Sequence, residues 1–112
     1  MTKANRKKTY PKRDPSRRPT HPGELLREDV IPYLVDEKGL TKTAIAEGLG
    51  MSRNQLYQIL AEKQPVTPET AVKLAAAFGG SAKSWLDMQM ACDLWDAERT
   101  VDVGPAKKLR AA

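Results

Sequence analysis

The 112-residue sequence has a single cysteine, Cys92, and a single histidine, His21. One cysteine forms no disulfide within the chain, and the two residues together cannot make up the His/Cys cluster of a zinc site. We therefore expect no metal and no other cofactor. No pattern of acidic or nucleophilic residues accompanies His21, so we expect this side chain to cap or pack a helix, and we expect no enzymatic activity.

Apolar side chains are too few and too scattered for a membrane span or a ligand-enclosing barrel. Hydrophobic residues make up 40% of the chain and aromatic residues 5%, which suits one small helical core. No apolar run approaches the roughly 20 residues that cross a bilayer, and the N-terminal stretch MTKANRKKTYPKR lacks the hydrophobic segment of a signal peptide. The expectation is a cytoplasmic protein without a membrane partner.

The net charge of +5 is unevenly distributed. Residues 1–20 hold eight lysines and arginines against Asp14, a charge of +7, so the other 92 residues sum to −2. With three prolines interspersed, the segment 1–19 is predicted to be a flexible basic tail. Such a tail can lie along DNA phosphates or in a minor groove, grip an acidic protein surface, or merely keep the protein in solution.

The stretch GLGMSRNQLYQIL predicts a sharp turn followed by a helix. Thr41 is a suitable N-cap for a helix over 42–49, Gly50 can take the left-handed conformation that closes it, and Ser52 is a suitable cap for a second helix over 53–61. This order is typical of a helix-turn-helix. Ala46 is small enough to let the two helices approach closely, and the residues placed to fill their crossing are Ile45, Leu49, Leu56 and Ile59.

The polar face of the second helix carries side chains suited to DNA. On a helical wheel Asn54 and Gln58 point away from the apolar side, and Arg53, Gln55 and Tyr57 flank them. Asn and Gln can pair with adenine and Arg with guanine in the major groove. Residues placed to contact phosphates are Lys42, Thr43 and Lys63. The alternative interpretation is a degenerate motif whose polar face only meets solvent.

Further helices are predicted on both sides of this motif. HPGELLREDV begins a helix that should stop or kink near Ile31, because Pro32 lacks an amide hydrogen, and a short second piece should end at Gly39. Thr67 and Pro68 begin another helix, which the glycine pair after Phe78 ends.

The last long helix, after Ser81, carries two apolar stripes where a surface helix needs one. One stripe comprises Trp85, Met88, Cys92 and Trp95, and the other comprises Leu86, Met90, Leu94 and Ala97. We expect one stripe to complete the core and the other to pack against a second copy, with Leu86, Met90 and Leu94 as the dimer interface. The alternative is a helix buried on both sides within one subunit. Residues 100–112 show no periodicity and are predicted to be a flexible tail.

Three stretches together resemble the HigA-type antitoxin family, a branch of the xenobiotic-response-element-like helix-turn-helix regulators. They are HPGELLRED, TKTAIAEGLGMSRNQLYQIL and VTPETAVKLAAAFGGSAKSWLDMQMACDLW. The resemblance implies an all-α, five-helix, lambda-repressor-like DNA-binding domain over residues 20–99, which dimerises through its C-terminal region. It also places the family's base-reading positions on Arg53, Asn54 and Gln58, with backbone contacts from Lys42, Ser52 and Gln55.

The resemblance implies an antitoxin that binds a small RNA-cleaving toxin of the HigB type and represses its own operon. As a homodimer it would bind a palindromic operator in double-stranded DNA upstream of that operon. The alternative function is a stand-alone helix-turn-helix repressor without a toxin partner.

Overall fold

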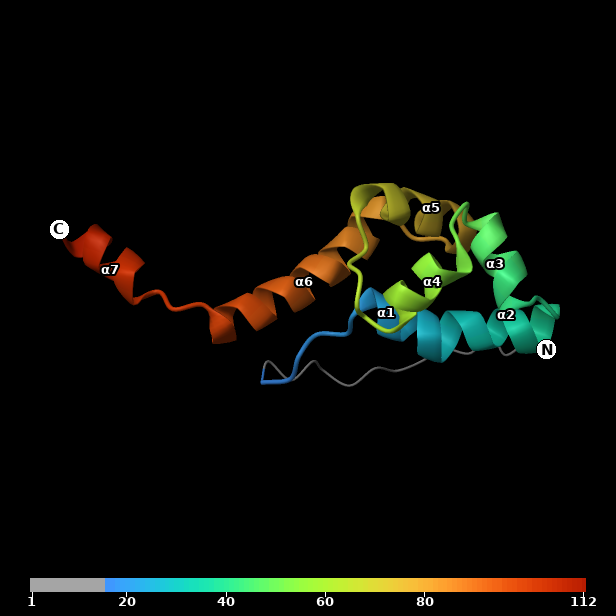
Figure 1. Ribbon diagram of the computed structural model, residues 1–112, viewed down its shortest axis with the longest axis horizontal. Helices are drawn as coiled ribbons and strands as arrows, with labels where there is room; N and C mark the ends of the chain where they lie inside the picture. The colour runs from blue at the N-terminus through green and yellow to red at the C-terminus, as the bar shows by residue number, and fades with distance from the viewer. Residues whose placement is uncertain (1–15) are drawn as a thin grey trace.

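The computed structural model describes residues 16–112, and this part of the chain is all helical, as predicted. Its elements are α1 (Pro22–Leu25), the π-helical turn η2 (Leu26–Val30), α2 (Ile31–Lys38), α3 (Lys42–Gly48), α4 (Arg53–Leu60), α5 (Pro68–Phe78), α6 (Ala82–Thr100) and α7 (Gly104–Ala111). In Figure 1 the helices from α1 to α5 form one body, α6 packs on the side of this body next to α5 and α1 and projects from it, and α7 lies beyond the far end of α6.

Side-chain caps begin the helices where the sequence predicts them. The Thr41 hydroxyl accepts a hydrogen bond from the Ala44 N–H at 3.0 Å, and the Ser52 hydroxyl accepts one from the Gln55 N–H at the same distance. Each cap satisfies a backbone donor that has no partner within its helix. Thr67 caps α5 in the same way, and Ser81 and Ser84 form a reciprocal capping box at the start of α6.

The first helical segment changes its winding ahead of Pro32 instead of ending there. The N–H of Ile31 donates to the carbonyl of Leu26, five residues earlier, so the chain follows a π-turn before α2 begins. A wider turn accommodates a proline ring that would clash with a carbonyl of a regular α-helix. Helix α2 then ends at Gly39, with a φ of 67°, as predicted.

The core lies where α1, α4, α5 and α6 meet. Side chains exposed by 2% or less include Leu26, Leu56, Ile59 and Leu74, all apolar. At Gly23 the backbone of α1 comes so close to α4 that a β-carbon would overlap the carbonyl oxygen of Ile59. The end of α4 therefore rests directly on the α1 backbone.

The two apolar stripes of α6 have different environments. Trp85 and Cys92 are buried and Met88 packs against the core, so the first stripe completes the body. Met90 and Leu94 of the second stripe are 63% and 55% exposed. Their neighbour in the predicted interface, Leu86, is half-buried and also packs against the core, in part because it lies nearer the body.

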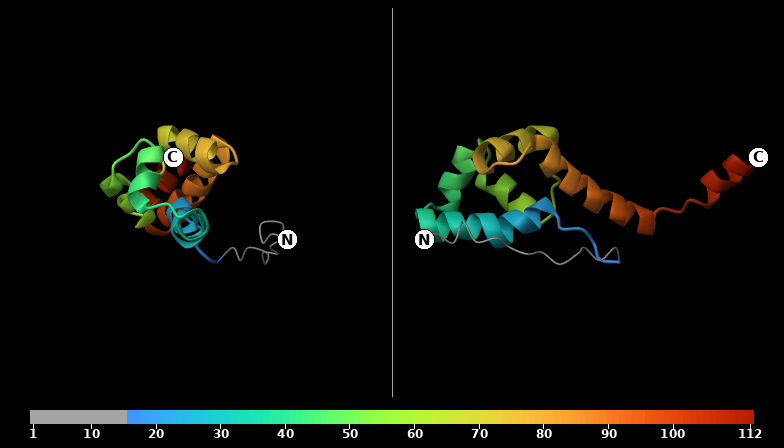
Figure 2. Two further views of the ribbon diagram at one scale, coloured as in Figure 1. Left: turned by 90° about the vertical axis from the view of Figure 1, so that its right-hand side faces the viewer. Right: turned by 180° about the vertical axis from the view of Figure 1, so that it is seen from behind.

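The structure differs from the sequence prediction at both ends of the domain. Residues 104–111 form α7 where we expected no regular structure, and Figure 2 shows this helix away from the body in a second view. Pro105 at the helix start explains the element, since it fixes the backbone angle of a first turn. At the other end Arg18 and Pro19 form hydrogen bonds with side chains of α6, so the ordered unit begins before residue 20. Residues 1–15 of the predicted basic tail lie outside the described residues.

Candidate nucleic-acid interface

Helices α3 and α4 are joined by a tight turn, which the backbone conformation of Gly50 and a hydrogen bond from Lys73 both stabilise. Gly50 has a φ of 66°, which a residue with a side chain adopts only with strain, and this conformation reverses the chain after α3. The ammonium of Lys73, on α5, donates a hydrogen bond to the Gly50 carbonyl at 3.3 Å. Ile45 and Leu56, predicted to fill the crossing of the helices, are buried, and so is the small Ala46. The pair therefore has helix-turn-helix geometry.

The candidate base-reading side chains differ in exposure. Arg53 and Asn54, at the N-terminal end of α4, are exposed, whereas Gln55 and Gln58 are half-buried. The N-terminal end of a recognition helix is the end that meets base edges. Ser52 directly before α4, Lys42 and Thr43 at the start of α3, and Lys63 after the C-terminal end of α4 are also exposed. The structure thus brings the predicted set together on α3, α4 and the turn that follows.

Tyr57 links the start of α3 to the start of α4. A guanidinium N–H of Arg53 donates to the Tyr57 hydroxyl at 3.1 Å. The guanidinium carbon of Arg53 and the ammonium of Lys42 lie 5.5 and 5.6 Å from the centre of the Tyr57 ring, within cation–π distance. The hydrogen bond from Arg53 is the main reason that the pKa of Tyr57 lies below its ordinary value. The phenol therefore restrains two cations of the interface.

Glu62, the second residue after α4, binds two arginines. Its φ of 63° makes it the one residue other than glycine with a positive φ among those described. Its carboxylate pairs with Arg18 at 3.1 Å and with Arg27 at 3.3 Å. Arg27 also donates to the carbonyl of Leu60 at 2.7 Å, which satisfies a free acceptor at the end of α4. These contacts fix the point at which the chain leaves α4 toward Lys63.

Two buried polar side chains secure the frame of the interface. His21 is 3% exposed, and its Nδ1 accepts a hydrogen bond from the Gly23 N–H at 2.9 Å, so it caps α1 as expected. Gln89 accepts a hydrogen bond from the Val66 N–H at 2.8 Å and so ties the segment after α4 to α6. Sequence reasoning missed Gln89, because a lone Gln in a helix gives no sign of a partner 23 residues away.

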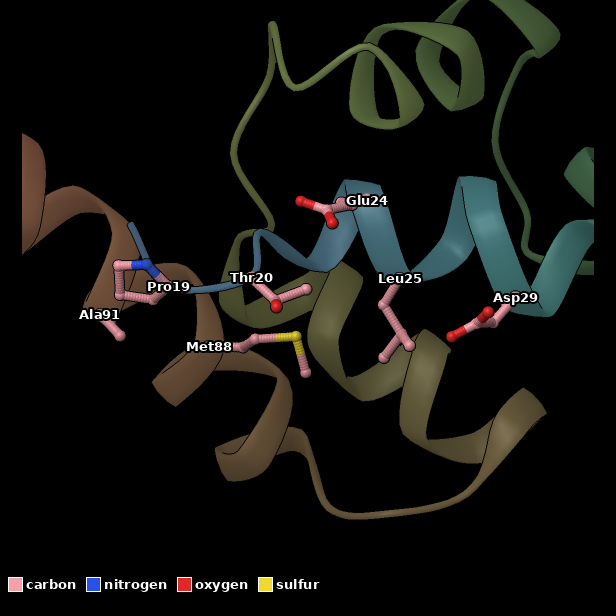
Figure 3. Close-up of a pocket in the computed structure, with 7 residues that line it drawn as sticks. All are labelled: Pro19, Thr20, Glu24, Leu25, Asp29, Met88 and Ala91. Carbon is pink, nitrogen blue, oxygen red and sulfur yellow. The ribbon is translucent and has the colours of Figure 1, made fainter. Parts of the chain in front are cut away.

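A cavity of about 470 Å³ lies between the first helix and α6, on other elements than the candidate DNA-binding residues (Figure 3). Its lining residues are Pro19, Thr20, Glu24, Leu25, Asp29, Met88 and Ala91. Within residues 16–112 no group of three His, Cys, Asp or Glu side chains is placed to hold a metal ion. No helix in that range is long and apolar enough to cross a membrane.

Sequence comparison agrees with this geometry. Residues 33–85, from α2 into the start of α6, match the helix-turn-helix family model. Virulence-associated protein I of Dichelobacter nodosus is 42% identical over 79 residues, which cover 70% of this chain and 69% of that protein. Antitoxin HigA-1 of Vibrio cholerae is 37% identical over 84 residues, which cover 75% of each chain.

Two solved structures with the same fold are structures of antitoxins. Antitoxin GraA is 35% identical with a TM-score of 0.63, and the match covers 74% of this chain and 85% of that one. Antitoxin HigA of Pseudomonas aeruginosa, in a structure with the higBA promoter, is 27% identical with a TM-score of 0.60, and the match covers 76% and 97%. By its sequence and by its fold, this chain belongs to the HigA-type antitoxin family of helix-turn-helix proteins.

Proposed function

We propose that this protein is an antitoxin that neutralises a small RNA-cleaving toxin of the HigB type and, as a dimer, represses its own operon. The main support is the exposed N-terminal end of α4, which carries Arg53 and Asn54 in a helix-turn-helix frame. A family member in a structure with its promoter adds weight to this proposal. A protein that binds its own operator acts in the cytoplasm, where that DNA lies.

The proposed DNA contacts fall into two groups, contacts to bases and contacts to phosphates. Asn54 and Gln58 offer amides to adenine edges, and Arg53 offers a guanidinium to guanine. Polar groups at the start of α3, at the start and on the flanks of α4, and after α4 meet phosphates and set the docking angle. Residues assigned to this second role are Lys42, Thr43, Ser52, Gln55, Tyr57 and Lys63. Gln58 is half-buried, so only the exposed part of its side chain is available to a base.

The exposed apolar stripe of α6 is the proposed dimer interface. Within residues 16–112, Met90 and Leu94 are large apolar side chains of α6 that remain exposed. Leu86 contributes less, because part of its surface already packs within the body. A two-fold axis there would present two copies of α4 to half-sites about one helical turn, roughly 34 Å, apart in a palindromic operator.

Fluorescence anisotropy tests the DNA-binding part of the proposal. The wild type and the variant Arg53→Ala/Asn54→Ala/Gln58→Ala are titrated with DNA from upstream of the gene and with scrambled DNA, at several salt concentrations. We expect tight, salt-sensitive binding of the upstream DNA by the wild type and no preference between the two DNAs in the variant. Equal losses on both DNAs would show that α4 does not read bases.

Co-purification tests the toxin part. The protein encoded beside this gene should purify with the chain at a fixed stoichiometry and lose its RNA-cleaving activity in the complex. If no such partner binds while operator binding persists, the protein is a stand-alone repressor.

A further inference from the structure

The cavity between the first helix and α6 combines an apolar floor with two carboxylates. Leu25 and Met88 are half-buried and approach each other from opposite walls, as Figure 3 shows. Glu24 and Asp29 stand at the margin and are exposed. A site of this kind fits an apolar side chain that has cationic neighbours on the same segment.

The carboxylates at this margin are free to pair with an incoming cation. Neither Glu24 nor Asp29 has an ion pair within residues 16–112, whereas the nearby arginines are already engaged. Arg27 pairs with Glu28 and Glu62, and Arg18 pairs with Asp96 and Glu62. Within residues 16–112 the cavity therefore carries two carboxylates that form no ion pair.

We propose that this cavity is the docking site for a cationic, amphipathic segment of the RNA-cleaving toxin. The inference rests on the proposed antitoxin function and assigns it a place on the surface. A protein that cleaves RNA has to bind a polyanion, which requires a basic surface of its own. An apolar side chain of that surface enters between Leu25 and Met88, and flanking Lys or Arg side chains pair with Glu24 and Asp29.

The cavity shares no residue with the candidate DNA interface. Its lining comes from residues 19–20, α1, η2 and α6, whereas the proposed DNA contacts come from α3, α4 and the turn after it. Charge reversal at the cavity therefore changes toxin binding without removing a DNA contact. Operator affinity becomes the internal check that a cavity variant is folded and dimeric.

The experiment measures the affinity of the full chain for the protein encoded by the adjoining gene, by isothermal titration calorimetry. The test variant is Glu24→Lys/Asp29→Lys. The matched control is Asp36→Lys/Glu37→Lys, which makes the same charge change on exposed side chains of α2 outside this cavity. We expect Kd to rise at least tenfold in the test variant and less than threefold in the control.

A second variant separates charge from shape. Glu24→Gln/Asp29→Asn keeps the size of both side chains and removes their charge, so its Kd should also rise and should depend less on salt than that of the wild type. In both cavity variants operator binding and the midpoint of thermal unfolding should stay close to those of the wild type.

Three other outcomes would overturn the inference. Normal toxin binding by both cavity variants would place the toxin elsewhere and leave the antitoxin function intact. A cavity variant that sediments as a monomer would show that the cavity is a contact between copies of this chain. A wild type that fails to bind the adjoining protein would refute the antitoxin function and this docking site together.

Discussion

Arg18 and Asp96 form a two-pronged ion pair across 78 positions of sequence. The Nε and Nη2 atoms of the arginine each lie 2.9 Å from a different carboxylate oxygen, and both partners lie at the surface, with the arginine side chain 37% exposed. Together with the bond from the Cys92 thiol to the Pro19 carbonyl at 3.0 Å, this pair fastens the start of the folded domain to α6.

Replacing Arg18 should cost little stability. Because solvent screens an ion pair at this exposure, we expect Arg18→Ala to lower the free energy of unfolding by about 0.5–1 kcal/mol in urea titration. Arg18→Lys keeps the charge but loses the paired donors. Its free energy of unfolding should therefore lie between those of the wild type and of Arg18→Ala. A loss well above 2 kcal/mol would mean that the residues before α1 are part of the core.

The protein should be more stable with glycine at position 62 than with alanine there. Both changes remove the carboxylate that pairs with Arg18 and Arg27, but only alanine keeps a β-carbon at a φ of 63°. We expect Glu62→Gly to exceed Glu62→Ala by about 1 kcal/mol in the free energy of unfolding. Equal stabilities of the two variants would contradict a strained backbone at this position.

Stability should fall as the pH drops below about 6.5 because of His21. Burial lowers the pKa of this imidazole below its ordinary value of 6.5, so the neutral form is favoured in the folded state. The stabilisation is complete above pH 6.5 and is lost as the pH falls toward the folded-state pKa, because the unfolded chain takes up the proton first.

The control for this pH effect is His21→Asn. Asparagine also caps a helix but does not titrate. Urea unfolding at pH 7.5 and 5.5 should show a larger drop for the wild type than for the variant. Parallel drops in the two proteins would assign the pH dependence to other groups.

Removing the Tyr57 hydroxyl should free Arg53. In Tyr57→Phe the ring remains near both cations, but Arg53 loses the acceptor at 3.1 Å. We expect a few-fold weaker operator binding by anisotropy, since a mobile guanidinium loses more entropy on binding. Arg53→Ala removes the other partner of this hydrogen bond. It should raise the pKa of Tyr57 toward its ordinary value, measured by the ultraviolet absorbance of the phenolate. A pKa that stays depressed would place the cause elsewhere.

Substitutions on the second stripe of α6 should separate assembly from folding. Met90→Glu/Leu94→Glu should give a monomer in sedimentation velocity, because it puts charge into the proposed interface, and should leave folding of the body intact. Leu86→Ala should destabilise the body by about 1–2 kcal/mol, since this side chain is only half-buried in the core. A double variant that remains dimeric would rule out the Met90 and Leu94 face.

Local chemistry made much of the fold predictable. Thr41, Ser52, Thr67 and Ser81 cap helices because a short hydroxyl side chain satisfies an exposed N–H wherever a helix begins. Gly50 ends its helix for an equally local reason. The family resemblance is confirmed, and with it the all-α fold. The base-reading roles of Asn54 and Gln58 stay predictions.

Features that depend on distant partners were not predictable. Nothing near Glu62 in sequence signals a left-handed residue, because the arginines that pair with it lie 44 and 35 positions earlier. The same is true of Gln89, whose acceptor role depends on Val66. The sequence predicted the kink near Ile31 but not its π-helical form. Helix α7 was missed because residues 100–112 show no periodicity, although Pro105 fits a first helical turn.

The absent side chain at Gly23 has a consequence for evolution of DNA recognition in this chain. Since the backbone of α1 touches the last turn of α4 there, any larger residue would lever that helix outward and tilt its reading end against the DNA. Under the proposed function, a substitution on the surface of α4 changes the contact to one base, whereas a larger residue at position 23 would shift the whole helix. The proposed operator contacts therefore depend on the glycine at this buried position as well as on the side chains of α4.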